Sequence, residues 1–342
     1  LPSGSIFDVG GSSMFPVKSF KNLDYVLALL NSKLAFYIAN CLNPTANIQV
    51  GDLQRVPFVV PEKNNETYIS NLAKQNILIT EELLTFDLVE PKFSKSLFLK
   101  FLNKSDSSKN IIRRFIEFVL YKKAIILMNE YLINKEISVV YNLTAYDSNL
   151  VIEDQGVDSA FFPLSKIAKD VFINTYKSEI TEDVKTHLEK ANILDKEVSV
   201  NLSFDKLFNS NKEIEDIAVE FQIHPIQVWY EFKNQEILPT KFVNNKAMEF
   251  LAELLREILL EDEDGIIPLV PNAGEKVLLD RIEEKFIEKD FSMAQYSSFD
   301  SVLGKELNVY INNHFFKAFS DYLNMFSYLP KTPFIWHLTS GP

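Results

Sequence analysis

Apolar residues recur at helical spacing over residues 22–42, near the start of the chain. They fall at positions 23, 26, 27, 30, 34, 37, 38 and 41, which predicts one amphipathic helix. Asn43-Pro44 should end it, because a residue before proline is pushed out of the helical region. From residue 66 onward the same periodicity dominates. It predicts helices over 66–76, 80–86, 107–133, 164–177, 181–191, 213–221, 225–234, 244–261, 275–289 and 304–327.

The aromatic content agrees with a mainly helical chain. There are 28 Phe and 13 Tyr but only 9 Gly. This balance favours large aromatic interfaces between elements over the many glycine turns that a sandwich of short strands needs.

Short strands are nevertheless expected near the N-terminus. Residues 6–16, IFDVGGSSMFP, suggest strand, glycine turn and return. Ile48–Val60 alternates and is rich in Val and Ile, with breaks at Gly51-Asp52 and Pro57, which predicts strand, turn, strand. Further short strands are expected at 137–140, 150–152 and 198–202.

The predicted fold is therefore α+β and predominantly α-helical, with a small α+β subdomain before a helical spacer. Polar residues 62–66 and the Pro- and Gly-rich stretch 265–274 suggest the boundaries. We expect a recognition-type domain at 1–62, a helical spacer with short strands at 63–265, and a C-terminal helical region at 266–342 ending in a strand-like segment.

Charge is unevenly distributed along the chain. The net charge is -12, but residues 1–125 hold 15 Lys and Arg against 11 Asp and Glu, a net of +4. The remainder therefore carries 20 minus 36, or -16. The two parts should prefer different partners, and only the first suits nucleic acid.

The sequence favours a cytoplasmic protein. The single cysteine, Cys41, lies on the apolar stripe of the first helix, as expected of a buried thiol in a reducing compartment. No window approaches 18 uninterrupted apolar residues, so we expect no membrane span. The start, LPSG, is not that of a signal peptide, and we expect both ends to be cut from a longer protein.

We expect no complete catalytic site, cofactor site or metal site. Gly10-Gly11 forms neither a dinucleotide-binding fingerprint nor a phosphate-binding loop, and no Asn-Pro-Pro-Tyr loop or G-x-S-x-G elbow occurs. The four histidines are far apart in sequence. A nuclease centre at Glu90-Pro91-Lys92 or Pro61-Glu62-Lys63 is the alternative, and exposed charged turns are the simpler interpretation.

The most informative candidates for recognition surround two predicted turns. Amides, a hydroxyl and a guanidinium could read base edges, and exposed backbone N–H groups could meet phosphate. The structural alternative is that Asn43 caps a helix, Gly51-Asp52 turns a hairpin and Arg55 is solvated. The candidates are Asn43, Pro44, Thr45, Gln49, Gly51, Asp52 and Arg55.

Two further patterns could contact DNA. A basic cluster could face phosphates along one helix, although Arg113, Arg114 and Lys122 do not all share one helical face and a merely solvated face is the favoured interpretation. The cluster is Lys104, Lys109, Arg113, Arg114, Lys122 and Lys123. Residues 213–233 are similar to a helix-turn-helix, but Gln222 replaces the turn glycine and Glu231 stands on the second helix. A packed helical hairpin is the alternative.

Several segments together resemble a known family. In order, they are FDVGGSSMFP, LLNSKLAFYI, LNPTANIQVGDLQRVPF, NLAKQNILITEE, DIAVEFQIHPIQVW and KTPFIWHLTSGP. This order resembles the C-terminal half of adenine-specific DNA methyltransferases of the type IIG restriction-modification group, especially the PglX methyltransferases of bacteriophage-exclusion (BREX) systems.

The resemblance implies a division of labour. In that family the N-terminal half binds S-adenosylmethionine and carries the Asn-Pro-Pro-Tyr loop, both lacking here. The resemblance implies that this chain recognises double-stranded DNA without catalysis. The residues that match the recognition-domain motif are Asn43, Pro44, Thr45, Gln49, Gly51, Asp52 and Arg55. The alternative is an interaction module that docks other subunits of the defence complex.

Overall fold

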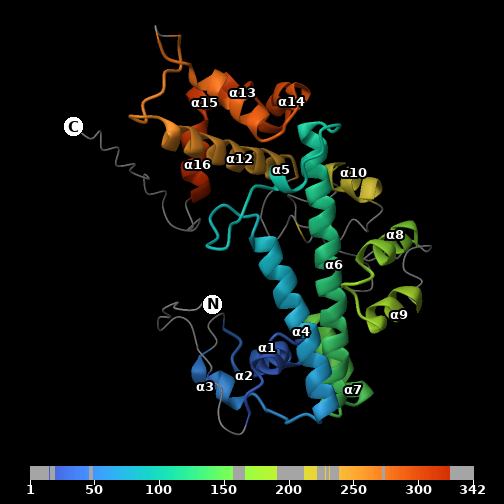
Figure 1. Cartoon of the computed structure of the whole chain (residues 1–342). Helices are drawn as coiled ribbons and strands as arrows, with labels where there is room; N and C mark the ends of the chain where they lie inside the picture. Colours follow the sequence, from blue (N-terminus) through green and yellow to red (C-terminus); the bar gives the residue numbers. More distant parts are fainter. Residues whose placement is uncertain are drawn as a thin grey trace. The chain divides into compact units, whose positions relative to one another are not determined.

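The chain folds into helices, and the described residues contain no β-strand. The structure is a computed structural model that describes residues 15, 20–45, 49–156, 166–190, 212–221, 228, 231, 239–271 and 274–323. It divides into two units: unit 1 comprises residues 1–80 and 121–199, and unit 2 comprises 81–120 and 200–342 (Figure 1).

The prediction of an α+β fold with a small β-containing subdomain is wrong. Within Ile48–Val60, the expected turn is helix α3 (Val50–Arg55). Residues 137–140 and 150–152 continue helices α6 (Ser108–Val140) and α7 (Ala145–Gln155). β-branched residues misled the prediction. At Ile137, which is 0% exposed, burial in a helix overrides strand propensity, whereas α3 contains no buried residue and begins with a capping interaction. Residues 6–16, apart from Phe15, and 198–202 lie outside the described residues.

The helix expected over residues 22–42 is two helices, α1 (Leu23–Leu30) and α2 (Lys33–Leu42). Ser32 separates them: its Oγ accepts a hydrogen bond from the Ala35 N–H at 3.2 Å and donates one to the Leu29 carbonyl at 2.7 Å. Serine is a preferred N-cap because it satisfies a helix-end N–H in this way. In the sequence the apolar pattern continues through the break, which explains why periodicity alone predicted one helix. The expectation that Cys41 is buried on that stripe is wrong, because Cys41 is exposed near the end of α2.

In unit 1, α1 and α2 are followed by α3 and by α4 (Lys63–Leu84), whose residues up to Thr80 belong to the unit. The unit also contains α7 and the part of α6 from Tyr121 onward. α8 (Lys166–Tyr176) and α9 (Glu182–Lys190) follow in sequence. α2 packs on α7 and on α3. The core here includes a fully buried amide: Asn129 Nδ2 donates to Gln75 Oε1 at 2.7 Å and to Asn76 Oδ1 at 2.8 Å.

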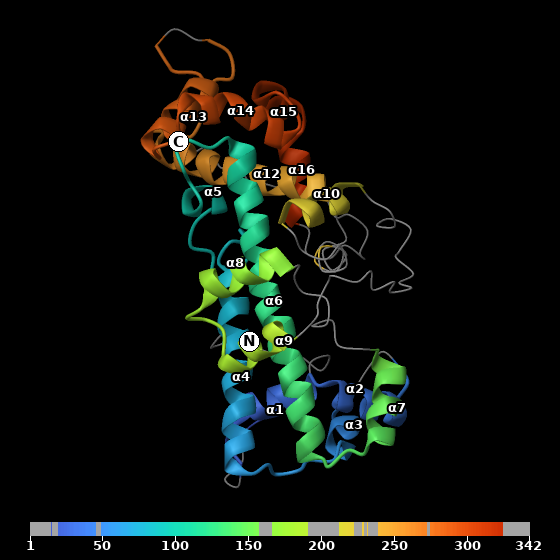
Figure 2. The same ribbon diagram turned by 90° about the vertical axis from the view of Figure 1, so that its right-hand side faces the viewer.

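Unit 2 is built around α12 (Pro239–Glu261), against which α14 (Met293–Leu303), α13 (Leu278–Glu288) and α16 (Phe315–Leu323) pack. Both views show α13 and α14 on one side of α12 (Figures 1 and 2). The remaining helices of this unit are α5 (Leu97–Lys100), α10 (Lys212–Phe221) and α15 (Leu307–Asn313).

Phenylalanine rings fill the core of unit 2. The Phe250 ring stacks on Phe98 with centroids 4.8 Å apart, and it packs in T-shaped geometry against Phe286 and Phe299. All four rings are buried. The high phenylalanine content is thus used as the sequence suggested, in aromatic interfaces between helices.

No single helix among the described residues has the length and hydropathy to cross a membrane. α1 and α2 meet those criteria only when counted as a pair, and they are bent by 64° at their junction.

Candidate nucleic-acid interface

Asn43 organises the turn that leaves α2. It is the C-cap residue of that helix, and its side-chain Oδ1 accepts hydrogen bonds from the Thr45 backbone N–H at 3.0 Å and the Thr45 hydroxyl at 2.6 Å. Its Nδ2 donates to Asp52 Oδ2 at 2.7 Å. The asparagine therefore ties the end of α2 to α3 across the intervening residues.

Asp52 fixes the start of α3. Its Oδ2 also accepts the backbone N–H of Gln49, the N-cap residue, at 3.0 Å. The hydrogen bond from Asn43, followed by that from Gln49, holds the pKa of the Asp52 carboxyl below its usual value, because both donors favour the ionised form. An aspartate in the first helical turn also suits the positive end of the helix dipole.

The face of α3 that remains open carries a glycine and a guanidinium. Gly51 and Arg55 are both exposed, as are Thr45 and Gln49. A Cβ added at Gly51 would meet no atom within 4 Å, so the glycine is not required by packing. Arg55 forms no ion pair within the described part of the chain, although its charge lies near Asp52 and helps to lower that pKa. The open face can thus offer charged donors to a phosphate or a guanine edge.

A tyrosine anchors the segment that follows α3. The hydroxyl of Tyr141, just beyond α6, donates to the Pro57 carbonyl at 2.6 Å and accepts from the Val59 N–H at 3.4 Å. Phe58 in the same segment meets Tyr25 and Phe20 edge-on, with centroids 6.0 and 5.1 Å apart. The chain on the C-terminal side of α3 is therefore held to unit 1 by side chains distant in sequence.

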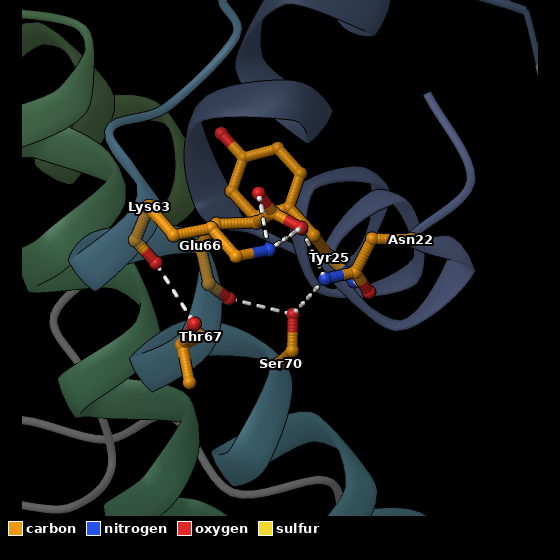
Figure 3. A network of polar contacts seen from close by, with 6 residues as sticks. All are labelled: Asn22, Tyr25, Lys63, Glu66, Thr67 and Ser70. Atoms are coloured by element: carbon orange, nitrogen blue, oxygen red, sulfur yellow. Dashed lines mark hydrogen bonds and ion pairs between the residues drawn. The ribbon is translucent and has the colours of Figure 1, made fainter. Parts of the chain in front are cut away.

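Beneath this surface, α1 is joined to α4 by a polar network (Figure 3). Asn22, the N-cap of α1, donates from Nδ2 to Glu66 Oε1 at 2.7 Å and to Ser70 Oγ at 2.9 Å. Its Oδ1 accepts the Tyr25 N–H at 3.2 Å. Lys63 lies 3.3 Å from Glu66, and the Asn22 bond, the largest cause, lowers the pKa of that carboxyl.

α2 is braced on its other side by α7. Lys33 Nζ donates to the carbonyls of Gln155 and Gly156 at 3.2 and 2.7 Å, and Asn40 Nδ2 lies 3.4 Å from Asp154 Oδ2. The candidate surface therefore stands on a frame of fixed helices.

The basic cluster of α6 is largely occupied by acidic partners. Within unit 2, Arg113 pairs with Glu220, and Arg114 pairs with Asp106. Lys104 lies 2.9 Å from Asp290. In unit 1, Lys122 is 4% exposed, pairs with Glu179 and lies 5.7 Å from the centroid of the Tyr176 ring. Lys123 is half-buried on the same helix.

These basic positions are divided between the two units. Arg113 and Arg114 belong to unit 2, whereas Lys122 and Lys123 belong to unit 1 with Asn43, Thr45, Gln49, Gly51, Asp52 and Arg55. The structure brings Asn43, Thr45, Gln49 and Asp52 into direct contact, with Gly51 and Arg55 on the same short helix.

The helix-turn-helix candidate is described only in part. Its first helix is α10, and Val228 and Glu231 are buried. The turn at 222–225 and most of the second helix lie outside the described residues, as do Gly10-Gly11 and the final PFIWHL. No group of three or more His, Cys, Asp or Glu side chains in the described ranges could hold a metal ion.

Sequence reasoning missed the contacts that shape the candidate surface. Asn43 contacts Asp52, and Tyr141 contacts Pro57, only in the folded chain. The neighbouring residues in the sequence did not predict these contacts. One signal was present: Gln49 and Asp52 stand three residues apart, as N-cap and N3 residues do in a helix that begins with a capping interaction.

Comparison with known proteins gives one relative of stated activity. Over 82 residues the chain is 37% identical to the adenine-specific methyltransferase BrxX of Escherichia coli O9:H4 (strain HS). The matched segment is 24% of this chain and 6% of that protein, so the chain spans a small fraction of the relative. No protein-family profile matches the chain. No solved structure matches it. Part of this chain is therefore related in sequence to an adenine-specific methyltransferase.

Proposed function

We propose that this chain is a non-catalytic DNA-recognition and scaffold part of an adenine-specific, N6-methylating DNA methyltransferase of a restriction-modification or phage-defence system. The observation that carries the proposal is the exposed, braced α3 with Arg55 on its open face, in a chain of which part is similar to an adenine-specific methyltransferase. Double-stranded DNA is the proposed ligand. S-adenosylmethionine would be bound by other parts of the whole enzyme.

The geometry supports different roles for the candidate residues. The side chains of Asn43 and Asp52 are already hydrogen-bonded to each other and to backbone N–H groups of the turn, which suits a structural role. Arg55 and Gln49 stand exposed and suit direct contact with phosphate or a base edge. Gly51 leaves room beside them, as a glycine does where another backbone approaches closely.

The hydrogen bonds that hold α3 in place favour specific recognition of DNA over nonspecific electrostatic binding. A donor that must meet a base edge has to be held in place before binding, because ordering a flexible side chain and loop on binding weakens affinity. The bonds from Tyr141 to Pro57 and from Asn43 to Asp52 restrain the chain on both sides of α3.

The proposal is tested by measuring binding of the whole chain to duplex DNA at low salt, for example by fluorescence anisotropy. Three variants are compared with the wild type: Arg55→Ala, Arg55→Lys and Lys305→Ala, the last removing an exposed positive charge from unit 2. We expect Arg55→Ala to weaken binding about tenfold, as loss of one charged contact does. Arg55→Lys should lose less, and Lys305→Ala should bind as the wild type does.

Two results would refute the assignment. One is absence of binding at low salt with every duplex tried, including adenine-rich duplexes. The other is equal affinity of Arg55→Ala and Lys305→Ala, which would mean that attraction is diffuse and that α3 has no special part in it.

A further inference from the structure

The end of α12 and the loop after it expose an unusual number of apolar side chains. Leu260 is 69% exposed, Ile266 65% and Val270 71%. Leu259 and Leu269 are also exposed. We call these five residues the apolar loop surface. The chain between α12 and α13 projects from these two helices in both views (Figures 1 and 2).

The loop is held in shape by its own hydrogen bonds. Asp262 Oδ1 accepts the Gly265 N–H at 2.9 Å, and Asp264 Oδ1 accepts the Ile266 N–H at 2.8 Å. Arg281 of α13 pairs with Asp262. Further along, the Leu278 N–H donates to the Pro268 carbonyl at 2.9 Å. A structured backbone thus holds these apolar side chains in contact with water. This exposure is unfavourable, and binding of a partner would remove the apolar area from water.

The surroundings of this surface are strongly acidic. Residues 257–289 contain 10 Asp and Glu and 4 Lys and Arg, a net charge of -6. All four cations are engaged with carboxylates: Lys276 with Glu284, Arg281 with Asp262 and Glu275, Lys285 with Glu261 and Glu288, and Lys289 with Glu257. Within the described ranges, Glu263, Asp264, Asp280 and Glu283 take part in no ion pair. The excess negative charge is therefore not neutralised by cations of the described part of the chain.

We infer that the apolar loop surface docks a cationic amphipathic helix of another protein, with apolar side chains covering Ile266 and Val270 and Lys or Arg side chains meeting Glu263 and Asp264. Charge selects this occupant. Duplex DNA and anionic lipid carry the same sign of charge as the surface and are repelled. A second copy of the chain would bring two acidic surfaces together, which like-charge repulsion disfavours.

This docking surface belongs to unit 2 and α3 belongs to unit 1, so the inference uses none of the residues of the proposed DNA contact. Hydrophobic contact would supply affinity, while the acidic surroundings would supply partner choice and rate of association. Removing one exposed valine and removing the negative charges should therefore weaken binding in distinguishable ways: the first at all salt concentrations, the second mainly at low salt.

The test uses the full chain and a synthetic peptide of about 18 residues, long enough for five helical turns, with leucines on one face and lysines on the other. A scrambled peptide of equal composition and a peptide with glutamate in place of lysine serve as controls. We expect the lysine peptide to bind, the scrambled one to bind at least about fivefold more weakly, and the glutamate peptide not to bind.

Matched variants locate the contact. Val270→Ser should weaken binding of the lysine peptide about fivefold or more, whereas Val219→Ser, which changes a valine of similar exposure (77%) on α10, should leave it unchanged. Glu263→Gln with Asp264→Asn should weaken binding and flatten its salt dependence. Unchanged thermal unfolding of every variant shows that the fold is retained.

The inference is overturned by lack of binding of the lysine peptide, by equal binding of its scrambled form, or by equal effects of Val270→Ser and Val219→Ser. Two other occupants are tested in parallel. Self-association in sedimentation that Val270→Ser abolishes would assign the surface to a second copy, and binding to phosphatidylserine vesicles that Val270→Ser abolishes would assign it to a membrane. Either result would overturn the cationic helix.

Discussion

Asp52 shows how one side chain can determine local structure at the candidate interface. Its carboxylate accepts hydrogen bonds from Asn43 on the preceding turn and from the Gln49 backbone. Sequence reasoning selected Asn43, Gln49 and Asp52 as a group because polar residues cluster there. It assigned Asn43 to the end of the first helix and Gly51-Asp52 to a hairpin turn, because Val50 and the residues around it favour strands and because Gly51-Asp52 is common in turns. The contact that decides for a helix joins residues nine positions apart.

The hydrogen bond from Asn43 should set the titration of Asp52. In Asn43→Ala we expect the Asp52 pKa to rise toward its ordinary 3.8, because the first cause of its lowering is removed. A depressed folded-state pKa stabilises the fold at pH values above the unfolded pKa, and this contribution is lost as the pH falls through the folded value. The wild type should therefore lose more stability than Asn43→Ala between about pH 4 and the folded pKa of Asp52.

Carboxyl NMR titration checks the pKa, and urea unfolding at several acid pH values checks the stability. Asp147 of α7 is the internal reference, since its pKa is lowered by Thr144 and not by Asn43. An Asp52 titration that is the same in wild type and Asn43→Ala would show that the hydrogen bond does not govern the carboxyl.

Substitution of Gly51 should change the stability of the fold and its affinity for DNA in opposite directions. The Gly51 backbone is helical, no atom lies within 4 Å of an added Cβ, and glycine is a poor helix former. We expect Gly51→Ala to stabilise the fold by about 0.5 kcal/mol, because alanine loses less backbone entropy. In Gly51→Ala, DNA affinity should fall if DNA occupies the space beside Gly51, because the added methyl group would lie in that space. Chemical denaturation and anisotropy measure the two effects, and a destabilised Gly51→Ala would contradict the helical assignment.

At the scale of elements, periodicity predicted where helices occur better than where they end. The pattern gave helices at 66–76 and 80–86, which the structure joins as α4, and at 107–133, which α6 extends to Val140. It missed α7, whose N-cap Thr144 and N3 residue Asp147 form a capping box, and α14, which begins with Ser292 and Gln295 in the same relation. Cap residues carried the missing signal, whereas helix length depended on burial in the folded core.

Asn22 links α1 to α4. This residue caps α1 and also donates to Glu66 and Ser70, so one side chain satisfies three groups. We expect Asn22→Ala to lower the free energy of unfolding by about 1–2 kcal/mol, the range for loss of a cap with further hydrogen bonds. Urea unfolding at neutral pH measures the change.

Asn31→Ala is the matched control for this prediction. Asn31 is exposed, and its side-chain amide donates to the Leu27 carbonyl of its own helix at 2.9 Å. Its loss should cost less than about 0.5 kcal/mol, as exposed substitutions usually do. Equal losses in the two variants would show that the network in Figure 3 adds nothing to the cap.

Considered as a whole molecule, the chain has a charge distribution that limits how it can meet DNA. The net charge of -12 makes the distant field repulsive, and the positive excess of residues 1–125 is reduced where Arg113 pairs with Glu220 and Lys122 with Glu179, acids from the later part of the chain. Sequence counting revealed the asymmetry but not the pairing, because Arg113 and Glu220 are 107 positions apart. Binding should therefore rest on few local contacts, and a general basic coat is not expected.

Few contacts predict a shallow salt dependence of DNA binding. Each phosphate neutralised contributes about 0.9 to the slope of log K against log salt, so removing one contact should reduce the slope by about that amount. We expect this reduction for Arg55→Ala, no change for Arg55→Lys, which keeps the charge, and no change for Lys305→Ala. Binding isotherms at four or more salt concentrations give the slopes. If Arg55→Ala changes neither a steep slope nor the affinity, other cations hold the DNA and α3 takes no part in binding. A slope that falls together with the affinity would make Arg55 a phosphate contact. If affinity fell while the slope stayed constant, Arg55 would instead contact a base edge.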